Sequence, residues 1–221
     1  MDNLITDKIR VHGYEKAYWR VLHPFFFLTP SPRILELGLG CGMPGGPGGS
    51  AETWESIFPL SNISFLEYDR ECGEKWVASI APPSRRPGMY YGDQSSDRTL
   101  DALMKDAHWD IVVDDASHLN AHQIKTLSNL IGAVRPGGVY VVEDIHSSCR
   151  RWRANMGGSS SKEFVDGTEG CMTTRGGKPT IFKFIHELQR EFASGRTVFL
   201  NGTELEGVAV FKSLAALFVA H

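Results

Sequence analysis

The chain of 221 residues lacks both an excess of one charge and any long hydrophobic run. Its formal net charge is −3, whereas dedicated nucleic-acid-binding proteins are usually basic. No window approaches the roughly 18 apolar residues of a membrane span. The N-terminus carries an acid, Asp2, where a secretory signal would carry base. We therefore expect no nucleic-acid partner, no membrane segment and a cytoplasmic location.

The sequence also lacks the spacings of several well-known sites. Its four cysteines form no C-x-x-C pair and no zinc-ligand pattern, so we expect reduced thiols. A G-K-[ST] phosphate loop and a G-x-S-x-G nucleophile elbow are absent as well. These absences argue against phosphate-loop nucleotide chemistry and serine-hydrolase chemistry.

Short apolar runs alternate with helical patterns, which is typical of an α/β fold with a largely parallel sheet. The length and a near-average composition, 42% hydrophobic and 22% charged, favour a single domain. The predicted strands are Arg33–Leu37, Ile63–Glu67, Met89–Tyr91, Asp110–Val113, Gly138–Val142, Val208–Lys212 and Ala215–Ala220. The predicted helices are Ala51–Phe58, Arg70–Ile80, Leu100–Ala107, Asn120–Val134 and Thr180–Ser194.

The last two predicted strands are separated by only two residues, Ser213 and Leu214, which predicts an antiparallel hairpin at the end of the sheet. Residues 154–178 are rich in glycine and serine, and a loop of that length is typical of a lid. We divide the single domain into four parts. They are an N-terminal helical cover (residues 1–32), a core (33–148), a mobile loop or lid (149–179), and a C-terminal helix with the hairpin (180–221).

Residues 34–42 read ILELGLGCG, a strand that runs directly into glycines. Glycines let the backbone approach a ligand, and the helix that follows points free N–H groups toward it. A dinucleotide fingerprint G-x-G-x-x-G counted from Gly38 needs a glycine where Met43 stands. Counted from Gly40 the fingerprint fits formally, but it starts late and includes Pro44. We therefore discount a dinucleotide.

The same loop has the form E-x-G-x-G-x-G and resembles motif I of the class I S-adenosylmethionine-dependent methyltransferases. The resemblance implies S-adenosylmethionine as cofactor, with Glu36 at the methionine end and Gly38, Gly40 and Gly42 beside methionine and ribose. It also implies a Rossmann-like fold with seven mostly parallel strands in the order 3-2-1-4-5-7-6, ending in the antiparallel hairpin.

Acidic residues at the ends of the next strands match further positions of that family. Asp69 matches the carboxylate that pairs with the ribose hydroxyls, with Glu67 as the alternative. Asp93 and Gln94 match the region that flanks adenine. Asp114 is assigned to the cofactor site or to local hydrogen bonding rather than to a metal. Open α/β sheets bind ligands at the carboxyl ends of their strands, so acids at successive strand ends favour a shared ligand.

Two further strand ends carry clustered carboxylates and histidines, with the sequences DDASH at residues 114–118 and EDIH at residues 143–146. Crowded carboxylates repel one another unless they are protonated or bound to a cation. Their oxygens suit Mg²⁺, Mn²⁺ or Ca²⁺ better than zinc. Such a metal could lower the pKa of a substrate hydroxyl while a histidine removes its proton. The same acids could instead hold a substrate amine.

This pair of motifs resembles the metal-dependent sugar O-methyltransferases of macrolide biosynthesis and the related cephalosporin-hydroxylase-like family. The resemblance implies Asp115, Glu143 and Asp144 as ligands of a divalent metal, most simply Mg²⁺, and His118 as the general base. The reverse, with His118 as a ligand and Asp115 as the base, stays open, and His146 is either a neighbour of the site or a substrate contact. The glycine loop, E-Y-D and G-D-Q also resemble the fungal hard-surface-induced proteins.

The resemblance therefore implies an S-adenosylmethionine-dependent O-methyltransferase that acts on a hydroxyl of a small specialised metabolite. The absence of a D/N-P-P-Y/F motif argues against methylation of a base or amide nitrogen. Two alternatives are a non-methylating reaction on the same fold (lyase, pericyclic or hydroxylase-like) and a non-catalytic interaction partner. The aromatic segment Gly13–Phe27 predicts a helix packed on the sheet or a cover over the acceptor pocket, and a homodimer is one assembly that it allows.

Overall fold

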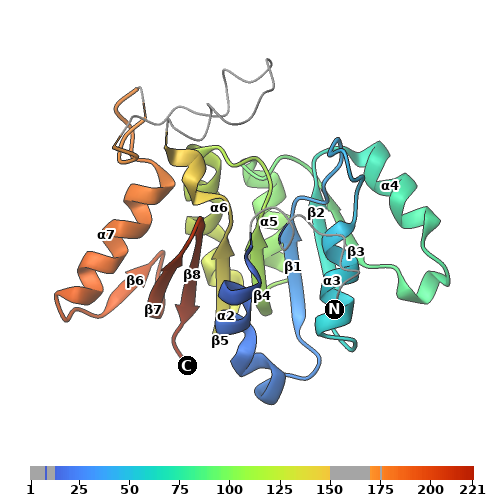
Figure 1. Cartoon of the computed structure of the whole chain (residues 1–221), viewed down its shortest axis with the longest axis horizontal. Coiled ribbons are helices and arrows are strands. Elements are labelled where there is room, and N and C mark those ends of the chain that lie inside the picture. The colour runs from blue at the N-terminus through green and yellow to red at the C-terminus, as the bar shows by residue number, and fades with distance from the viewer. Residues whose placement is uncertain (1–7, 9–12, 150–169, 175) are drawn as a thin grey trace.

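The computed structural model describes residues 8, 13–149, 170–174 and 176–221. An eight-stranded sheet in the order β3-β2-β1-β4-β5-β8-β7-β6 lies between two layers of helices (Figure 1). The strands are β1 (Arg33–Leu37), β2 (Asn62–Glu67), β3 (Gly88–Tyr91), β4 (Trp109–Asp114), β5 (Val134–Val142), β6 (Val198–Leu200), β7 (Thr203–Phe211) and β8 (Leu214–Val219). The helices are α2 (Glu15–Leu28), α3 (Gly49–Ile57), α4 (Arg70–Ser79), α5 (Asp97–Lys105), α6 (Asn120–Leu130) and α7 (Ile181–Ala193).

The predicted strand order is confirmed, with one edge strand added. Strands β1 to β5 pair in parallel, and β8, β7 and β6 are antiparallel. The additional strand β6 has only 3 residues, too few to leave a periodic pattern in the sequence. The hairpin between β7 and β8 turns at Lys212 and Ser213, one residue earlier than predicted, and Ser213 has a φ of +64°.

Alternate residues of the central strands face two separate hydrophobic cores. On one face, Leu35 and Leu37 of β1 pack with the buried sides of α5, α6 and α7. On the other face, Ile34 packs with residues of α2 and α3 and with Trp76 of α4. In Figure 1, α2 crosses in front of the sheet while α5 and α6 lie behind it. This burial on both faces fixes the register of the strands and therefore the positions of their ends.

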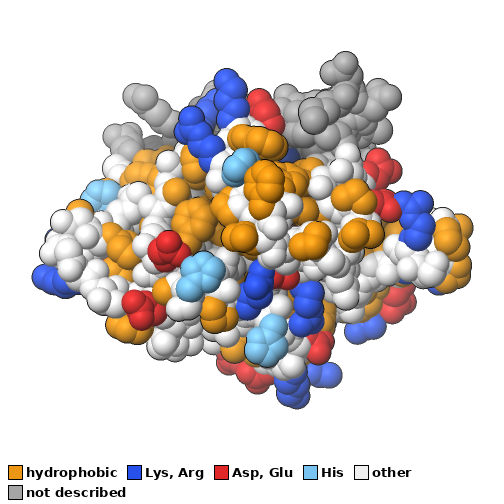
Figure 2. All heavy atoms as spheres, turned by 90° about the horizontal axis from the view of Figure 1, so that it is seen from below, with side chains coloured by type: hydrophobic (Ala, Val, Ile, Leu, Met, Phe, Trp, Pro, Cys, Tyr) orange, Lys and Arg blue, Asp and Glu red, His pale blue; other side chains and the backbone are white. Residues whose placement is uncertain are grey.

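Helix α2 confirms the prediction of a packed helix in the aromatic N-terminal segment. Its buried residues are Ala17, Tyr18, Val21, Leu22 and Phe25. Its other side leaves Trp19, Phe27 and Leu28 exposed by 60%, 76% and 74%. Figure 2, seen from below, shows hydrophobic side chains gathered among charged ones on that face of the molecule. Among the described helices, none combines the length and apolar character needed to cross a membrane.

The expectation of reduced thiols is wrong, because the four cysteines form two disulfides. Cys41 is bonded to Cys72, and Cys149 to Cys171, with Cα–Cα distances of 6.2 Å and 4.4 Å. The sequence separations of 31 and 22 residues match no spacing signature, so the fold alone reveals these pairs. Disulfides persist mainly outside reducing compartments. The cysteines therefore no longer favour a cytoplasmic location.

The predicted lid at residues 149–179 falls largely on residues 150–169 and 175, which lie outside the described part of the chain. Among the described residues from 170 onward, Thr173 and Pro179 form an isolated antiparallel β-bridge. The lid stays a prediction.

Candidate active site

The carboxyl ends of β1, β4 and β5 lie next to one another at the upper edge of the sheet in Figure 1. Strand β1 pairs with β4, and β4 pairs with β5, so the residues at these strand ends emerge side by side. Three acids from the three strand ends, Glu36, Asp115 and Glu143, meet there, because the ammonium of Lys8 contacts all of their carboxylates. This is the edge at which open α/β sheets bind ligands.

The glycine loop leaves β1 in a backbone conformation that favours glycine. Gly38, Gly40 and Gly42 have φ values of +99°, +85° and +84°. At Gly38 a side chain is also excluded by contact, since a Cβ there would lie 2.3 Å from the carbonyl oxygen of Asp115. The loop therefore runs directly against the chain that follows β4, which places the predicted cofactor loop beside the predicted metal ligands.

Substituting alanine for Gly38 should destabilise the protein more than the same change at Gly42. Both positions strain a residue with a Cβ, by roughly 1–2 kcal/mol, but a Cβ at Gly42 would have no neighbouring atom within 4 Å, whereas one at Gly38 would meet the Asp115 backbone. We expect Gly38→Ala to lower the free energy of unfolding by about 3 kcal/mol or more and Gly42→Ala by about 1 kcal/mol. Denaturant titration of both variants measures this, and equal losses would contradict the close approach.

Glu36 is held beneath this loop with only 1% of its surface exposed. Its Oε2 accepts a hydrogen bond of 2.7 Å from Nε1 of Trp54 in α3, and its Oε1 lies 3.0 Å from Nζ of Lys8. Burial raises the pKa of Glu36, and the charge of Lys8 opposes that rise. The carboxylate is therefore fixed in place by two neutral donors, Trp54 and Ser50, and by the charged Lys8.

The two acids after β2 have different environments. Glu67 is buried, and its carboxylate accepts hydrogen bonds from the backbone N–H of Leu39 at 3.1 Å and of Asp69 at 2.8 Å. Asp69 is exposed and caps α4, accepting a bond of 3.0 Å from the N–H of Cys72. Glu67 thus braces the glycine loop, whereas Asp69 has free surface to offer a ligand.

The acids after β3 and β4 are engaged in local hydrogen bonds. Asp93 accepts bonds of 2.7 Å from both the N–H and the hydroxyl of Ser95, and these bonds lower the pKa of Asp93. Gln94 donates from Nε2 to Oδ1 of Asp114 at 3.1 Å, and Asp114 is 0% exposed. Burial raises the pKa of Asp114 to about 6. The carboxylate of Asp114 therefore has the local role considered for it, and it has no exposed surface with which to touch a cofactor.

A groove of about 610 Å³ runs between the glycine loop and α4. Pro47 of the loop lines one side, and Asp69, Cys72 and Trp76 line the other. The Cys41–Cys72 disulfide joins the same two segments. The groove is therefore lined in part by Asp69, the acid predicted to bind ribose.

Asp115, His118 and Asp144 form a compact group of possible metal ligands. One ligand atom from each lies within 4.8 Å of the others, and Nε2 of His118 is 3.7 Å from carboxylate oxygens of both aspartates. His118 and Asp144 have φ values of +53° and +54°, which are uncommon for residues other than glycine and concentrate at functional sites. Nδ1 of His146 lies 3.8 Å from Asp144. Two of the three predicted ligands, Asp115 and Asp144, thus lie together with His118, and the third, Glu143, contacts the same lysine as Asp115.

Glu143 instead contacts Lys8 and helix α2. Its Oε1 lies 2.8 Å from Nζ of Lys8 and accepts a hydrogen bond from the hydroxyl of Tyr18. The hydroxyl of Tyr14, at the start of α2, donates to Oδ1 of Asp144 at 2.5 Å. Residues four apart lie on one face of a helix, so a single face of α2 contacts two consecutive acids.

Burial and charge determine the protonation of this cluster. Burial raises the pKa of Glu143 well above its ordinary value, and the nearby Asp115 adds to the rise while Lys8 opposes it. Burial by itself lowers the pKa of Lys8, but Asp115, Glu143 and Glu36 together raise it well above the ordinary value. Lys8 is therefore a buried ammonium.

The donor set suits a divalent cation. Lys8 contacts three acids (Glu36, Asp115 and Glu143), and Asp144 lies next to them through His118, so these acids outnumber the cations they contact and could take up a further cation. Nδ1 of His118 is buried and has no hydrogen-bond partner within the described residues. The carboxylate oxygens suit Mg²⁺ or Mn²⁺, whereas an imidazole ligand is more typical of zinc, iron, copper or nickel.

Sequence reasoning missed Lys8, Tyr14, Tyr18 and Trp54, all of which contact the predicted acids. The spacing of four between the tyrosines was a usable signal, because it places two polar tips on the buried face of an aromatic helix. Nothing in the sequence near Lys8 or Trp54 indicated a carboxylate partner.

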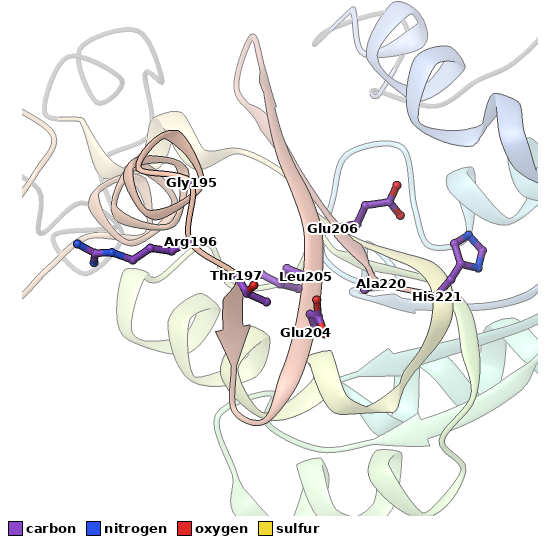
Figure 3. Close-up of a pocket in the computed structure, with 8 residues that line it drawn as sticks. All are labelled: Gly195, Arg196, Thr197, Glu204, Leu205, Glu206, Ala220 and His221. Carbon is purple, nitrogen blue, oxygen red and sulfur yellow. The ribbon is translucent and has the colours of Figure 1, made fainter.

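A second hollow, of about 480 Å³, lies at the opposite edge of the sheet (Figure 3). It is lined by residues of the α7–β6 connection, β7 and the C-terminus, and in the close-up Arg196 points away from Glu206 and His221. Because its charged side chains do not converge, it lacks the character of a reaction site.

Comparison with known proteins finds O-methyltransferases. The chain is 33% identical over 138 residues to mycinamicin VI 2''-O-methyltransferase of Micromonospora griseorubida, covering 62% of this chain and 32% of the relative. It is 30% identical over 188 residues to 8-demethyl-8-alpha-L-rhamnosyl tetracenomycin-C 2'-O-methyltransferase of Streptomyces olivaceus, covering 79% and 46%. The structure of MycE methyltransferase with Mg and SAH aligns with a TM-score of 0.69 and 26% identity over 99% of this chain and 53% of the other.

The chain spans only about a third to a half of the length of these curated relatives. No model of a known protein family matches it.

Proposed function

We propose that the chain transfers a methyl group from S-adenosylmethionine to a hydroxyl of a small specialised metabolite. The premise is that the chain is a homologue of the sugar O-methyltransferases and has the class I methyltransferase fold. The observation that carries the proposal is the contact between the glycine loop and the acid cluster at Gly38 and Asp115. A methyl donor bound at this loop would therefore lie next to an acceptor held by the acids.

The cofactor would lie along the glycine loop and the groove beside α4. Glu36 is the group for its methionine end, the loop glycines at 38, 40 and 42 pass beside methionine and ribose, and exposed Asp69 is the partner for the ribose hydroxyls. Asp93 and Gln94 lie in the loop proposed to flank adenine. Gln94 accepts a 2.8 Å hydrogen bond from the N–H of Ser117 and so fixes the loop after β4.

Asp115, Glu143 and Asp144 would hold a divalent metal, and Nε2 of His118 lies 3.7 Å from both aspartates. A bound metal supplies positive charge that lowers the pKa of the acceptor hydroxyl. His118 is the group placed to remove the hydroxyl proton, while the acceptor oxygen attacks the methyl carbon and the bond from carbon to sulfur breaks. The protein's main contribution is to align the two reactants.

The experiment that tests this function is methyl transfer from S-adenosylmethionine labelled in its methyl group to a panel of hydroxylated and glycosylated metabolites, with Mg²⁺ or with EDTA. We expect label in the organic product with Mg²⁺ and little with EDTA. Calorimetric binding of S-adenosylmethionine without label in any acceptor would favour a non-methylating reaction on the same fold. Failure of S-adenosylmethionine to bind would contradict the cofactor site itself.

We also propose a homodimer that buries the exposed aromatic side of α2. Trp19, Phe27 and Leu28 are more than half exposed, and apolar patches of this kind mark interaction surfaces. Sedimentation velocity should show a dimer for the wild type and a monomer for Trp19→Ser/Phe27→Ser. A wild-type protein that sediments as a monomer at tens of micromolar would contradict the dimer.

A further inference from the structure

Lys8 contacts acids that are proposed for two different ligands. Its Nζ lies 2.6 Å from Asp115 Oδ2 and 2.8 Å from Glu143 Oε1, two of the acids proposed for the metal. The same atom lies 3.0 Å from Glu36 Oε1, the acid proposed for the methionine end of the cofactor. The side chain is only 4% exposed.

A buried ammonium in this position limits what else the acids can bind. A divalent metal that used Asp115 and Glu143 would have to share them with Lys8 or displace it, because like charges repel strongly at such distances in a buried site. The positively charged amino group of the cofactor would meet the same conflict at Glu36. A metal bound to Asp115 and Glu143, and a cofactor amine bound to Glu36, would therefore act on the same lysine.

We propose that Lys8 is a tethered cation that occupies the acid cluster before ligands bind, and that its displacement couples the metal site to the cofactor site. This proposal rests on the proposed function, since it takes the two ligands from there. Whichever ligand binds first bears the cost of moving Lys8, and the second ligand then binds to a site already vacated. Metal and cofactor therefore bind with positive coupling, which by linkage is equal in both directions.

The test is calorimetric titration of Mg²⁺ into the full chain, with and without saturating S-adenosylhomocysteine, for wild type, Lys8→Met and Lys183→Met. Lys183 is the matched control because its ammonium pairs with Glu187 of its own helix α7 rather than with the acids of the cluster. In wild type and Lys183→Met we expect S-adenosylhomocysteine to raise Mg²⁺ affinity about fivefold or more. In Lys8→Met we expect Mg²⁺ alone to bind about tenfold tighter, with the effect of S-adenosylhomocysteine lost.

A second measurement needs no variant, in case Lys8→Met fails to fold. Reductive methylation of wild-type lysines, read by peptide mass spectrometry, reports how accessible Lys8 is. We expect slow labelling of Lys8 in the ligand-free protein and clearly faster labelling with saturating Mg²⁺, while labelling of Lys183 stays constant.

Unchanged or weaker Mg²⁺ affinity in Lys8→Met, the same coupling in all three proteins, or Lys8 labelling that Mg²⁺ leaves unchanged or slows would each overturn the proposal. These readouts involve no turnover. A protein that shows the expected coupling but transfers no methyl group would therefore contradict the proposed reaction and leave the role of Lys8 standing.

Discussion

Replacing His118 by alanine should lower kcat for methyl transfer by about 10²–10⁴-fold, the usual contribution of a general base. The ring is held between Asp115 and Asp144, and its backbone has a φ of +53°, a conformation retained only where the surroundings enforce it. The matched control is His186→Ala on the exposed side of α7, which should retain full activity. Steady-state kinetics with labelled S-adenosylmethionine measures both variants.

Metal titration of the same variant distinguishes the two roles left open for His118. If His118 is the base, His118→Ala binds Mg²⁺ with nearly wild-type affinity although its kcat falls. If His118 is a ligand, affinity and rate fall together, and Asp115 becomes the group to test as the base. A variant with unchanged kcat would contradict any direct role for His118.

Breaking the Cys41–Cys72 disulfide should lower the free energy of unfolding by about 3–4 kcal/mol, the value expected from chain entropy for a loop of this size. The bond closes a loop of 31 residues that contains α3 and β2. The corresponding fall in melting temperature is about 10 °C for a domain of this length. We also expect weaker S-adenosylmethionine binding, because the bond joins the glycine loop to the start of α4 beside Asp69.

Thermal unfolding of Cys41→Ala, Cys72→Ala and the double variant tests this prediction. Each single variant should lose nearly as much stability as the double variant, because either change removes the same bond. Additive single effects, or a wild-type melting temperature that does not change in dithiothreitol, would show that the two cysteines contribute separately rather than through a disulfide.

The parts of the site that the sequence predicted are those that depend on short local sequence patterns and on the parallel pairing of neighbouring strands. Apolar runs located the strands, and parallel neighbours necessarily bring residues such as Asp115 and Asp144 to one edge. The glycine loop was recognisable because its glycines follow a strand directly, and Gly38 indeed leaves no room for a side chain. In each case the signal lies within about ten consecutive residues.

The missed features depend on contacts between distant parts of the chain. Tyr14 and Tyr18 reach acids 130 and 125 residues away, and Lys8 reaches Glu143 over 135 residues. The cysteine pairs likewise follow from the packing of neighbouring loops. The sequence places Asp114 and Asp115 side by side in one acidic motif, but Asp114 is the buried last residue of β4, whereas Asp115 follows the strand and contacts Lys8.

The Cys149–Cys171 disulfide has a consequence for how the protein can diversify. The two Cα atoms lie 4.4 Å apart, so the residue that follows η3 (Ile145–Ser148) and a residue ahead of α7 are held side by side. Each doubling of a flexible loop costs only about 0.6 kcal/mol. A change in the number of residues between the two cysteines should therefore cost little stability and leave both anchor points, the sheet and its row of acids in position.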